Sequence, residues 1–287
     1  MSIKIFVGNI EVPHQSFQFP GGEVQVRITG KPPGYRIRIL AHIHKSADLL
    51  ELLLVTNALK KMRQPGEDQS IELMLPYVPY ARQDRVCVPG EALAIEVLAD
   101  IINAQNYSRV YMLDAHSDVA PALIKNAVNR GQEELLGLFI LPSGRSNTVL
   151  VAPDAGAIKK THKVATWLGF KEVVRADKLR NVSNGEITDT VVYSDHIGNR
   201  DFLIVDDICD GGRTFVELAK KLRPLTDGNV NLYVTHGIFS RGIEVFDGLI
   251  DKIYVANIFN QFLANGGNTP GGGPKVFACE ENTWLYL

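Results

Sequence analysis

Short runs of apolar, largely β-branched residues alternate along the chain with longer segments in which apolar residues recur every three or four positions. This alternation is typical of a parallel sheet that is covered by helices. The clearest helical segment has apolar residues at positions 49, 50, 53, 54 and 57. The pattern predicts strands at residues 3–7, 36–42, 71–75, 109–113, 148–152, 202–205 and 231–235, and helices at residues 47–62, 91–104, 121–128, 157–167 and 214–222.

The same rhythm of strands and helices runs through both halves of the chain. A length of 287 residues suits roughly two domains of about 150 residues each. Turn-forming residues at 130–134 and 142–144 are the best boundary candidates, and we place the division near residue 142, between domains 1–142 and 143–287. Residues 177–199 are polar and poorly periodic, which predicts a mobile loop or flap, and the glycine-rich residues 264–274 predict an irregular surface loop.

Composition excludes several classes of protein. An apolar fraction of 45% supports a sizeable core, so the chain as a whole is not disordered. A net charge of −2 does not provide the cationic surface that nucleic acid or an anionic membrane requires. No apolar run reaches the ~20 residues of a membrane span, and the first residues lack the features of a secretory signal. Three widely separated cysteines (Cys87, Cys209 and Cys279) argue against a disulfide framework or a zinc site, so we expect a soluble cytoplasmic protein.

The segment at residues 203–214, LIVDDICDGGRT, carries the strongest chemical signal. An apolar strand runs into Asp206 and Asp207; Asp210, Gly211 and Gly212 follow, and a helix begins near Thr214. A glycine loop at a helix N-terminus offers free backbone N–H groups to a phosphate. The carboxylates can accept hydrogen bonds from sugar hydroxyls or hold Mg²⁺ through water. The segment therefore predicts a site for a phosphorylated sugar with a metal; the alternative is a helix cap beside a solvated acidic turn.

This segment resembles the phosphoribosyl diphosphate binding motif, whose usual form is DDxxDTGGT after an apolar strand. Further segments follow in a characteristic order: PYVPYARQDRVCVPGEALA (76–94), LDAHS (113–117), VAPDAG (151–156), DKLR (177–180) and VTHGIFS (234–240). Together with residues 19–28 and 46–61 they resemble the ribose-phosphate pyrophosphokinase family over nearly the whole chain. The resemblance implies an α/β fold of two related phosphoribosyltransferase-type domains, each a mainly parallel sheet flanked by helices.

The resemblance also implies a reaction and a set of roles. ATP and ribose 5-phosphate give AMP and 5-phosphoribosyl 1-diphosphate, through transfer of the β,γ-diphosphoryl group to the C1 hydroxyl. The implied residues are Lys178 and Arg180 for catalysis; Phe19, Glu23, Arg82 and Gln83 for ATP; Asp206, Asp207, Asp210, Gly211, Gly212, Arg213 and Thr214 for ribose 5-phosphate; and His116 and Asp154 for Mg²⁺. Taken alone, residues 82–85 also suit a surface salt-bridge run, His116 a structural hydrogen bond, and Lys178 and Arg180 a solvated surface.

Three features depart from the family's usual pattern. Gly211 stands where the motif has threonine, and Arg213 where it has glycine. Arginine does not readily adopt the positive φ that glycine permits, so either Arg213 adds a charged contact to the phosphate or the loop has a different shape. Gly21 replaces an aspartate in the segment that, in the family, reaches the adenine of a neighbouring subunit, which leaves the choice of nucleotide open. The chain is shorter than common family members, especially near its C-terminus, so control by phosphate or ADP should not be assumed.

Two rival functions remain open. A phosphoribosyltransferase that consumes the diphosphate shares residues 203–214 but needs neither ARQDR, nor DAHS, nor a second α/β half. A non-catalytic regulatory subunit of a synthetase tends to lose the loop Lys-x-Arg pair or the metal-binding histidine, and this chain retains both. The resemblance also implies a homo-oligomer, in which a neighbouring subunit completes the nucleotide site.

Overall fold

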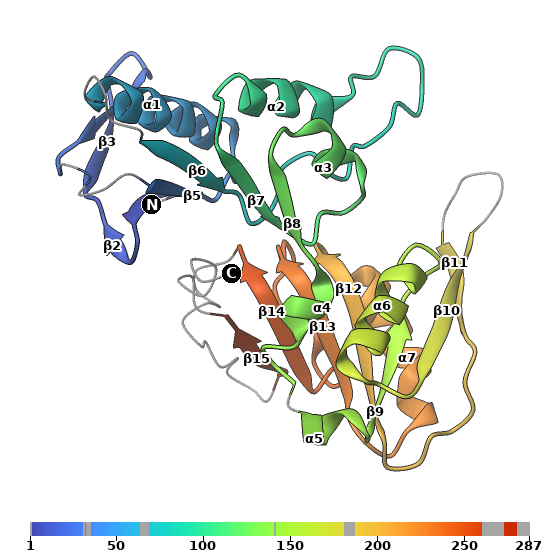
Figure 1. Cartoon of the computed structure of the whole chain (residues 1–287). Coiled ribbons are helices and arrows are strands. Elements are labelled where there is room, and N and C mark those ends of the chain that lie inside the picture. The colour runs from blue at the N-terminus through green and yellow to red at the C-terminus, as the bar shows by residue number, and fades with distance from the viewer. Residues whose placement is uncertain are drawn as a thin grey trace. The chain divides into compact units, whose positions relative to one another are not determined.

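The computed structural model describes residues 2–30, 32, 36–63, 69–140, 142–180, 187–259 and 273–279. The chain forms two compact units, and the boundary between them lies between Arg130 and Gly131 (Figure 1). This boundary falls at the first of the two turn-rich segments that the sequence marks. The expected division near residue 142 coincides with the start of helix α5 (Pro142–Arg145), inside the second unit.

The first unit is built on a six-stranded sheet in the order β2-β1-β5-β6-β7-β8. The pairs β5–β6, β6–β7 and β7–β8 are parallel, whereas β1 pairs antiparallel with both β2 and β5. The sheet is therefore mainly parallel, as expected. Its strands are β1 (Ile3–Val7), β2 (Ile10–Glu11), β5 (Arg36–Ala41), β6 (Ser70–Met74), β7 (Arg109–Leu113) and β8 (Ala127–Arg130).

Three helices and a separate hairpin complete this unit. The helices are α1 (Ser46–Met62), α2 (Ala94–Asn103) and α3 (Val119–Leu123). Strands β3 (His14–Gln18) and β4 (Val24–Ile28) form the antiparallel hairpin, and β4 packs against α1. The core contains side chains that are fully buried between the sheet and α1, among them Ile5, Ile39, Leu52, Val55 and Leu73. Burial of such side chains supplies most of the free energy that holds the layers together.

The second unit is built on a seven-stranded sheet in the order β11-β10-β9-β12-β13-β14-β15 (Figure 1). Every neighbouring pair is parallel except β10–β11. Central strand β13 is buried along its whole length, because helices or loops cover both faces of a parallel sheet. The strands are β9 (Thr148–Ala152), β10 (Val173–Arg180), β11 (Ile187–Val192), β12 (Asp201–Cys209), β13 (Val230–Gly237), β14 (Lys252–Ile258) and β15 (Lys275–Ala278).

The second unit contains two long helices, one after β9 and one after β12. They are α6 (Ile158–Leu168) and α7 (Arg213–Leu222), and the shorter α4 (Gln132–Leu136) packs against α6 and β13. The α6 helix ends at Gly169 in a left-handed conformation, φ 76°, the usual way to stop a helix. Among the described residues, no helix has both the length and the hydropathy needed to cross a membrane.

The structure corrects two expectations about local structure. The helix expected near residues 121–128 is only the short α3, and residues 127–128 belong to strand β8. The segment 177–199, expected as a loop, contains the end of β10 and all of β11, which pair as antiparallel strands from Ala176–Val192 to Arg180–Ile187. β11 (ITDTVV) is a short edge strand inside a segment that is polar overall, so the segment as a whole shows no clear strand period. Most of the glycine-rich segment 264–274 lies outside the described residues.

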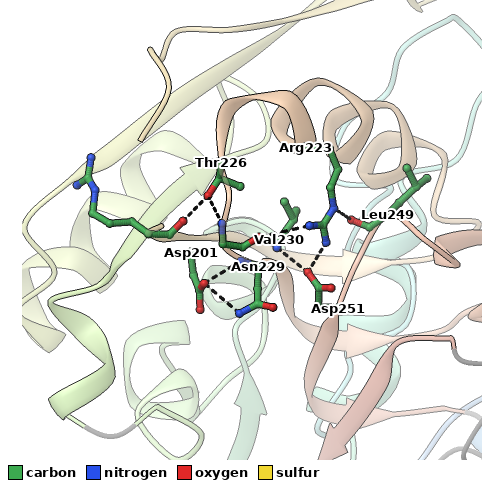
Figure 2. Close-up of polar contacts among 9 residues, drawn as sticks. Asp201, Arg223, Thr226, Asn229, Val230, Leu249 and Asp251 are labelled. Atoms are coloured by element: carbon green, nitrogen blue, oxygen red, sulfur yellow. Dashed lines mark hydrogen bonds and ion pairs between the residues drawn. The ribbon is translucent and has the colours of Figure 1, made fainter. Parts of the chain in front are cut away.

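Polar contacts connect the amino ends of the central strands of the second unit (Figure 2). Asp201 opens β12, and its Oδ1 accepts hydrogen bonds from the backbone N and the Nδ2 of Asn229, at 2.8 and 3.0 Å. The hydroxyl of Thr226 donates to the carbonyl of Gly198 at 3.0 Å and accepts from the N–H of Gly228 at 2.9 Å. Side chains thus pair backbone groups that the strands themselves leave without partners.

Asp251 links three elements at the same end of the sheet (Figure 2). Its Oδ2 accepts a hydrogen bond from the backbone N of Val230 at 2.8 Å and forms an ion pair with Arg223. Arg223 also donates from Nε to the carbonyl of Leu249 at 3.0 Å. The start of β13 and the segments after α7 and before β14 are therefore connected through one carboxylate.

Asp251→Ala should lower the free energy of unfolding by about 1–3 kcal/mol, because the Val230 N–H loses its acceptor and Arg223 loses its ion-pair partner. The midpoint of urea unfolding, followed by circular dichroism, measures the change. Glu217→Ala is the matched control: it breaks an exposed 3.0 Å ion pair with Lys220 and should cost less than about 0.5 kcal/mol. Equal midpoints for the two variants would contradict this role of Asp251.

Candidate active site

The loop between β12 and α7 has the local geometry of an anion site. Strand β12 ends at Cys209 and α7 begins at Arg213, so the predicted phosphate loop spans only a few residues. Gly212 caps α7 in a left-handed conformation with φ 76° and ψ −7°. The first turn of α7 contains no acidic residue. Its N–H groups carry partial positive charge and lack partners within the helix, which suits a phosphate.

The left-handed turn explains which glycine of this loop is indispensable. A Cβ atom on Gly212 would lie 2.8 Å from Cζ of Phe246, and its positive φ disfavours any other residue. Arg213 is the first helical residue and is absent from the described non-glycine residues with positive φ. The positive φ that arginine disfavours therefore occurs at Gly212 and not at Arg213. The loop accommodates Arg213 without backbone strain.

Two adjacent carboxylates lie at the end of β12, and each is held by a neighbour. Oδ1 of Asp206 accepts a hydrogen bond from the backbone N of Asp207 at 2.9 Å. Asp207 is buried, and its Oδ2 lies 3.5 Å from Nζ of Lys160 on α6. An ion pair compensates part of the cost of burying a carboxylate. Sequence reasoning missed Lys160, because only the packing of α6 beside the strand brings it to Asp207.

Asp154, predicted as a metal ligand, follows β9 at the same edge of the sheet. The parallel register pairs Val151 of β9 with Ile204 of β12, so Asp154 and Asp207 each stand three residues beyond a matched pair. Oδ1 of Asp154 accepts hydrogen bonds from the backbone N of Gly156 at 3.0 Å and of Ala157 at 3.2 Å. These bonds fix the carboxylate in the turn that leads into α6.

In the first unit, the predicted ATP segment meets the predicted metal-binding segment. Arg82 and Gln83 are exposed in the loop after β6. The next residue, Asp84, accepts a hydrogen bond from Nε of Arg85 at 2.8 Å and another from the side chain of Ser117. The pKa of Asp84 is lowered mainly by the hydrogen bond from Arg85. The hydrogen bond from Ser117 and the charges of Arg85 and His116 lower it further, although partial burial acts in the opposite direction. Asp84 thus joins the ARQDR and DAHS segments, a contact that spacing alone does not reveal.

The turn after β7 has a constrained backbone. Asp114 is buried and has a φ of 38°, in the left-handed region that few residues other than glycine adopt. Its N–H donates to the carbonyl of Arg130 at 2.7 Å, and the N–H of Ala115 donates to Oδ1 of Asn129 at 3.0 Å. This turn leaves the side chain of His116 exposed.

The remaining ATP-site candidates, Phe19 and Glu23, lie in the loop of the β3–β4 hairpin. Both are exposed, and the backbone N of Phe19 donates to the carbonyl of Glu23 at 2.8 Å. The ring of Phe19 packs edge-on against that of Phe17, with centroids 5.3 Å apart. An exposed aromatic pair on a projecting hairpin offers a surface for stacking.

The catalytic candidates Lys178 and Arg180 lie at the end of strand β10, where the backbone of Lys178 pairs with that of Thr190 in β11. Their side chains lie outside the described residues. The base of this β10–β11 hairpin is fixed: Arg175 forms an ion pair with Asp177, and its guanidinium lies over the ring of Tyr193, 5.2 Å from the centroid. The Arg175 hydrogen bond lowers the pKa of Asp177.

The predicted metal ligands His116 and Asp154 do not form a recognisable metal-binding cluster in the described part of the chain. Among the described residues, no group of three or more His, Cys, Asp or Glu side chains is arranged to hold a metal ion. His116 belongs to the first unit and Asp154 to the second.

Comparison with known proteins identifies the family. A model of the N-terminal domain of ribose phosphate pyrophosphokinase matches residues 3–105. The ribose-phosphate pyrophosphokinase of Pyrococcus furiosus is 31% identical over 261 residues, which cover 88% of this chain and 87% of that protein. The protein of the same name from Mycoplasma pneumoniae is 33% identical over 221 residues, 74% of this chain but only 65% of that relative, so the match spans just under two thirds of its length.

The fold comparison agrees. A phosphoribosylpyrophosphate synthetase from Mycobacterium smegmatis superposes with a TM-score of 0.75, covering 93% of this chain and 86% of the other at 23% identity. Two mainly parallel sheets flanked by helices define a protein of the phosphoribosyltransferase fold class. Within that class, this chain belongs to the ribose-phosphate pyrophosphokinase family.

Gly212→Ala should lower the free energy of unfolding by roughly 1–3 kcal/mol, because it combines a strained φ with a clash against Phe246. Urea unfolding followed by circular dichroism provides the measurement. Gly211→Ala is the matched control, since its Cβ would meet no atom closer than 3.5 Å and its φ lies outside the left-handed region. The assignment of the turn fails if the two alanine variants are equally stable.

Proposed function

We propose that this chain is a ribose-phosphate diphosphokinase. It transfers the β,γ-diphosphoryl group of ATP to the C1 hydroxyl of ribose 5-phosphate. The anomeric oxygen forms a bond to the β-phosphorus, the bond from that phosphorus to the oxygen bridging the α-phosphorus breaks, and AMP leaves with the bridging oxygen. The hydroxyl proton is released, and we assign no residue as its acceptor.

One observation carries this proposal. In a chain of this family, the carboxyl end of β12 combines two acidic side chains with a glycine-capped helix N-terminus. Asp206 and Asp207 suit ribose hydroxyls, and the loop 210–214 suits a 5-phosphate through its backbone N–H groups and the hydroxyl of Thr214. The single site then accounts for both the sugar and the phosphate of the acceptor.

Phosphoryl-type transfer depends on positioning and charge stabilisation more than on a protein nucleophile. Lys178 and Arg180 supply positive charge from the β10–β11 hairpin. Arg82 and Gln83 suit the phosphates and polar groups of ATP. Closure of the hairpin over the substrates would exclude water, which otherwise competes with the sugar hydroxyl as the nucleophile.

Mg²⁺ is the proposed cofactor, with His116 and Asp154 as its protein contacts, directly or through water. Bound with ATP, it neutralises phosphate charge as the diphosphoryl group is transferred. Asp154 suits this role because backbone N–H groups orient its carboxylate. In the first unit, Asp84 lies near enough to His116 for their charges to interact, and it carries the negative charge that favours a cation there.

The hairpin loop with Phe19 and Glu23 supports a homo-oligomer. Both side chains are exposed at the end of a projecting element, where they suit the nucleotide site of a neighbouring subunit. ATP and ribose 5-phosphate are metabolites of the cytoplasm, so we propose that location for the enzyme.

Purified protein incubated with ATP, Mg²⁺ and ribose 5-phosphate should produce AMP and the sugar diphosphate in equal amounts. Chromatography of the nucleotides together with phosphorus NMR measures both products. Formation of ADP without AMP would contradict diphosphoryl transfer. Absence of turnover with intact nucleotide binding would instead support the regulatory-subunit alternative, and consumption of the sugar diphosphate with a free base would support a phosphoribosyltransferase.

Lys178→Ala should lower kcat by about 10²–10³-fold and change the KM for ribose 5-phosphate by less than about threefold, because a charge that acts on the transition state adds little to ground-state binding. Steady-state kinetics with both substrates provide the measurement. Lys171→Ala removes an exposed lysine just before β10 and should leave kcat unchanged. An unaltered kcat in Lys178→Ala would remove this lysine from the mechanism.

A further inference from the structure

Two arginine side chains beside the phosphate loop lack a partner within the described part of the chain. Arg213 is the first residue of α7, and Arg241 lies in the loop after β13; both are exposed. Apart from Arg27, every other arginine whose side chain is described takes part in a polar or ring interaction; these are Arg36, Arg38, Arg63, Arg82, Arg85, Arg109, Arg130, Arg145, Arg175, Arg200 and Arg223. The two unpaired guanidinium groups of the second unit therefore belong to segments that meet at one loop.

The position of Arg213 is unfavourable for a cation in the free protein. The N-terminus of a helix carries partial positive charge, so acidic residues favour its first turn and basic residues favour its last turn. α7 follows this rule at its C-terminal end with Lys220 and Lys221, but its first turn contains no acidic residue and begins with Arg213. An anion bound at this end of the helix would attract both the helix N-terminus and Arg213, and would offset the repulsion between them.

Arg241 packs directly on the loop, at the position where a side chain is missing. A Cβ atom on Gly211 would lie 3.5 Å from Cδ, 3.6 Å from Nε and 3.8 Å from Cγ of Arg241. Gly211 is not among the glycines with positive φ, so its backbone does not require a glycine. A Cβ atom at these distances would make ordinary van der Waals contact, so the stem of Arg241 lies directly beside the backbone of Gly211.

The segment that carries Arg241 is fixed to the loop by its backbone. The N–H groups of Ile238 and Phe239 donate to the carbonyl of Cys209 at 2.8 and 3.1 Å, and that of Ser240 donates to the carbonyl of Asp210 at 3.2 Å. Phe239 has a φ of 48°, and its ring is buried. A strained, hydrogen-bonded turn holds its backbone in one conformation, so the base of the Arg241 side chain is fixed relative to the phosphate loop.

We propose that Arg241 and Arg213 bind the 5-phosphate of the acceptor sugar, in place of the threonine hydroxyl that the usual motif places at position 211. This inference rests on the proposed function of the same site. A guanidinium donates paired, charge-assisted hydrogen bonds to phosphate oxygens, which a hydroxyl does not match. Positions 211 and 213 both depart from the usual motif. Together with Arg241 they form a phosphate site that selects a sugar bearing a dianionic group.

Arg241→Ala and Arg213→Ala should each weaken binding of ribose 5-phosphate by about 10–100-fold, the effect expected for one lost charge-assisted contact. Titration calorimetry without ATP measures binding independently of turnover. In kinetics, the KM for ribose 5-phosphate should rise by a similar factor, whereas kcat and the KM for ATP change by less than about twofold. Arg241→Lys should retain part of the affinity. Lys220→Ala, which removes an exposed cation at the other end of α7, should bind like the wild type.

Coupling between positions 211 and 241 gives a second, sharper measurement. Gly211→Thr should weaken ribose 5-phosphate binding in the wild type, because Cβ alone would already contact the stem of Arg241 and the further atoms of threonine would crowd it. In the Arg241→Ala background the same change should not weaken binding further and should restore part of it through the threonine hydroxyl, so the two effects are strongly non-additive.

The outcomes separate the two proposals. Wild-type affinity in Arg241→Ala and Arg213→Ala, or strictly additive effects at 211 and 241, would overturn the arginine site while leaving diphosphoryl transfer intact. A wild-type protein that binds ribose 5-phosphate without forming AMP would overturn the proposed reaction but leave the arginine site in place. A wild-type protein that does not bind ribose 5-phosphate would overturn both.

Discussion

Parallel pairing of β12 with its two neighbours is the constraint on which the candidate site depends. In-register hydrogen bonding places the carboxyl ends of β9, β12 and β13 at one edge of the sheet. Residues far apart in the chain, namely Asp154, Asp207 and the segment that carries Arg241, then follow matched strand ends. The left-handed turn at Gly212, closed by Phe246, directs α7 away from the same edge. Without this register, the acidic side chains and the helix N-terminus would not share a site.

Charge is distributed locally in a way that the overall balance conceals. The net charge is only −2, yet three aspartates at the end of β12 and in the following loop lie near two arginines, one on α7 and one after β13. Neither arginine has a partner in the described chain. Lys160 compensates the buried Asp207, which leaves the arginines available for an external anion. At the opposite ends of the strands, Asp251 and Asp201 serve the backbone and a neighbouring guanidinium, so similar carboxylates have structural roles there (Figure 2).

The sequence predicted strands correctly where a short run of apolar residues marks the strand. The strands at residues 3–7, 109–113 and 148–152 have the predicted bounds, because each is a compact run in which most residues are apolar and buried. Prediction failed at β8 (AVNR) and β11 (ITDTVV), which are short edge strands that each pair with a single neighbouring strand. The β3–β4 hairpin was also missed: β4 (VQVRI) alternates apolar and polar residues, but its partner β3 (HQSFQ) is almost entirely polar. Mainly parallel sheets, by contrast, followed directly from the alternation of elements.

The sequence by itself determined the α/β class, the family and the candidate residues of the 203–214 loop, because apolar periodicity and contiguous motifs act over a few residues. Only the tertiary structure decided which glycine takes the left-handed turn, that Lys160 pairs with Asp207, and that Arg241 packs on Gly211. Those contacts join segments separated by about 30 to 50 positions, and the hydrogen-bond register of parallel strands brings them together. Local patterns carry no information about such register, so the chemistry at this edge of the sheet emerges only in the folded chain.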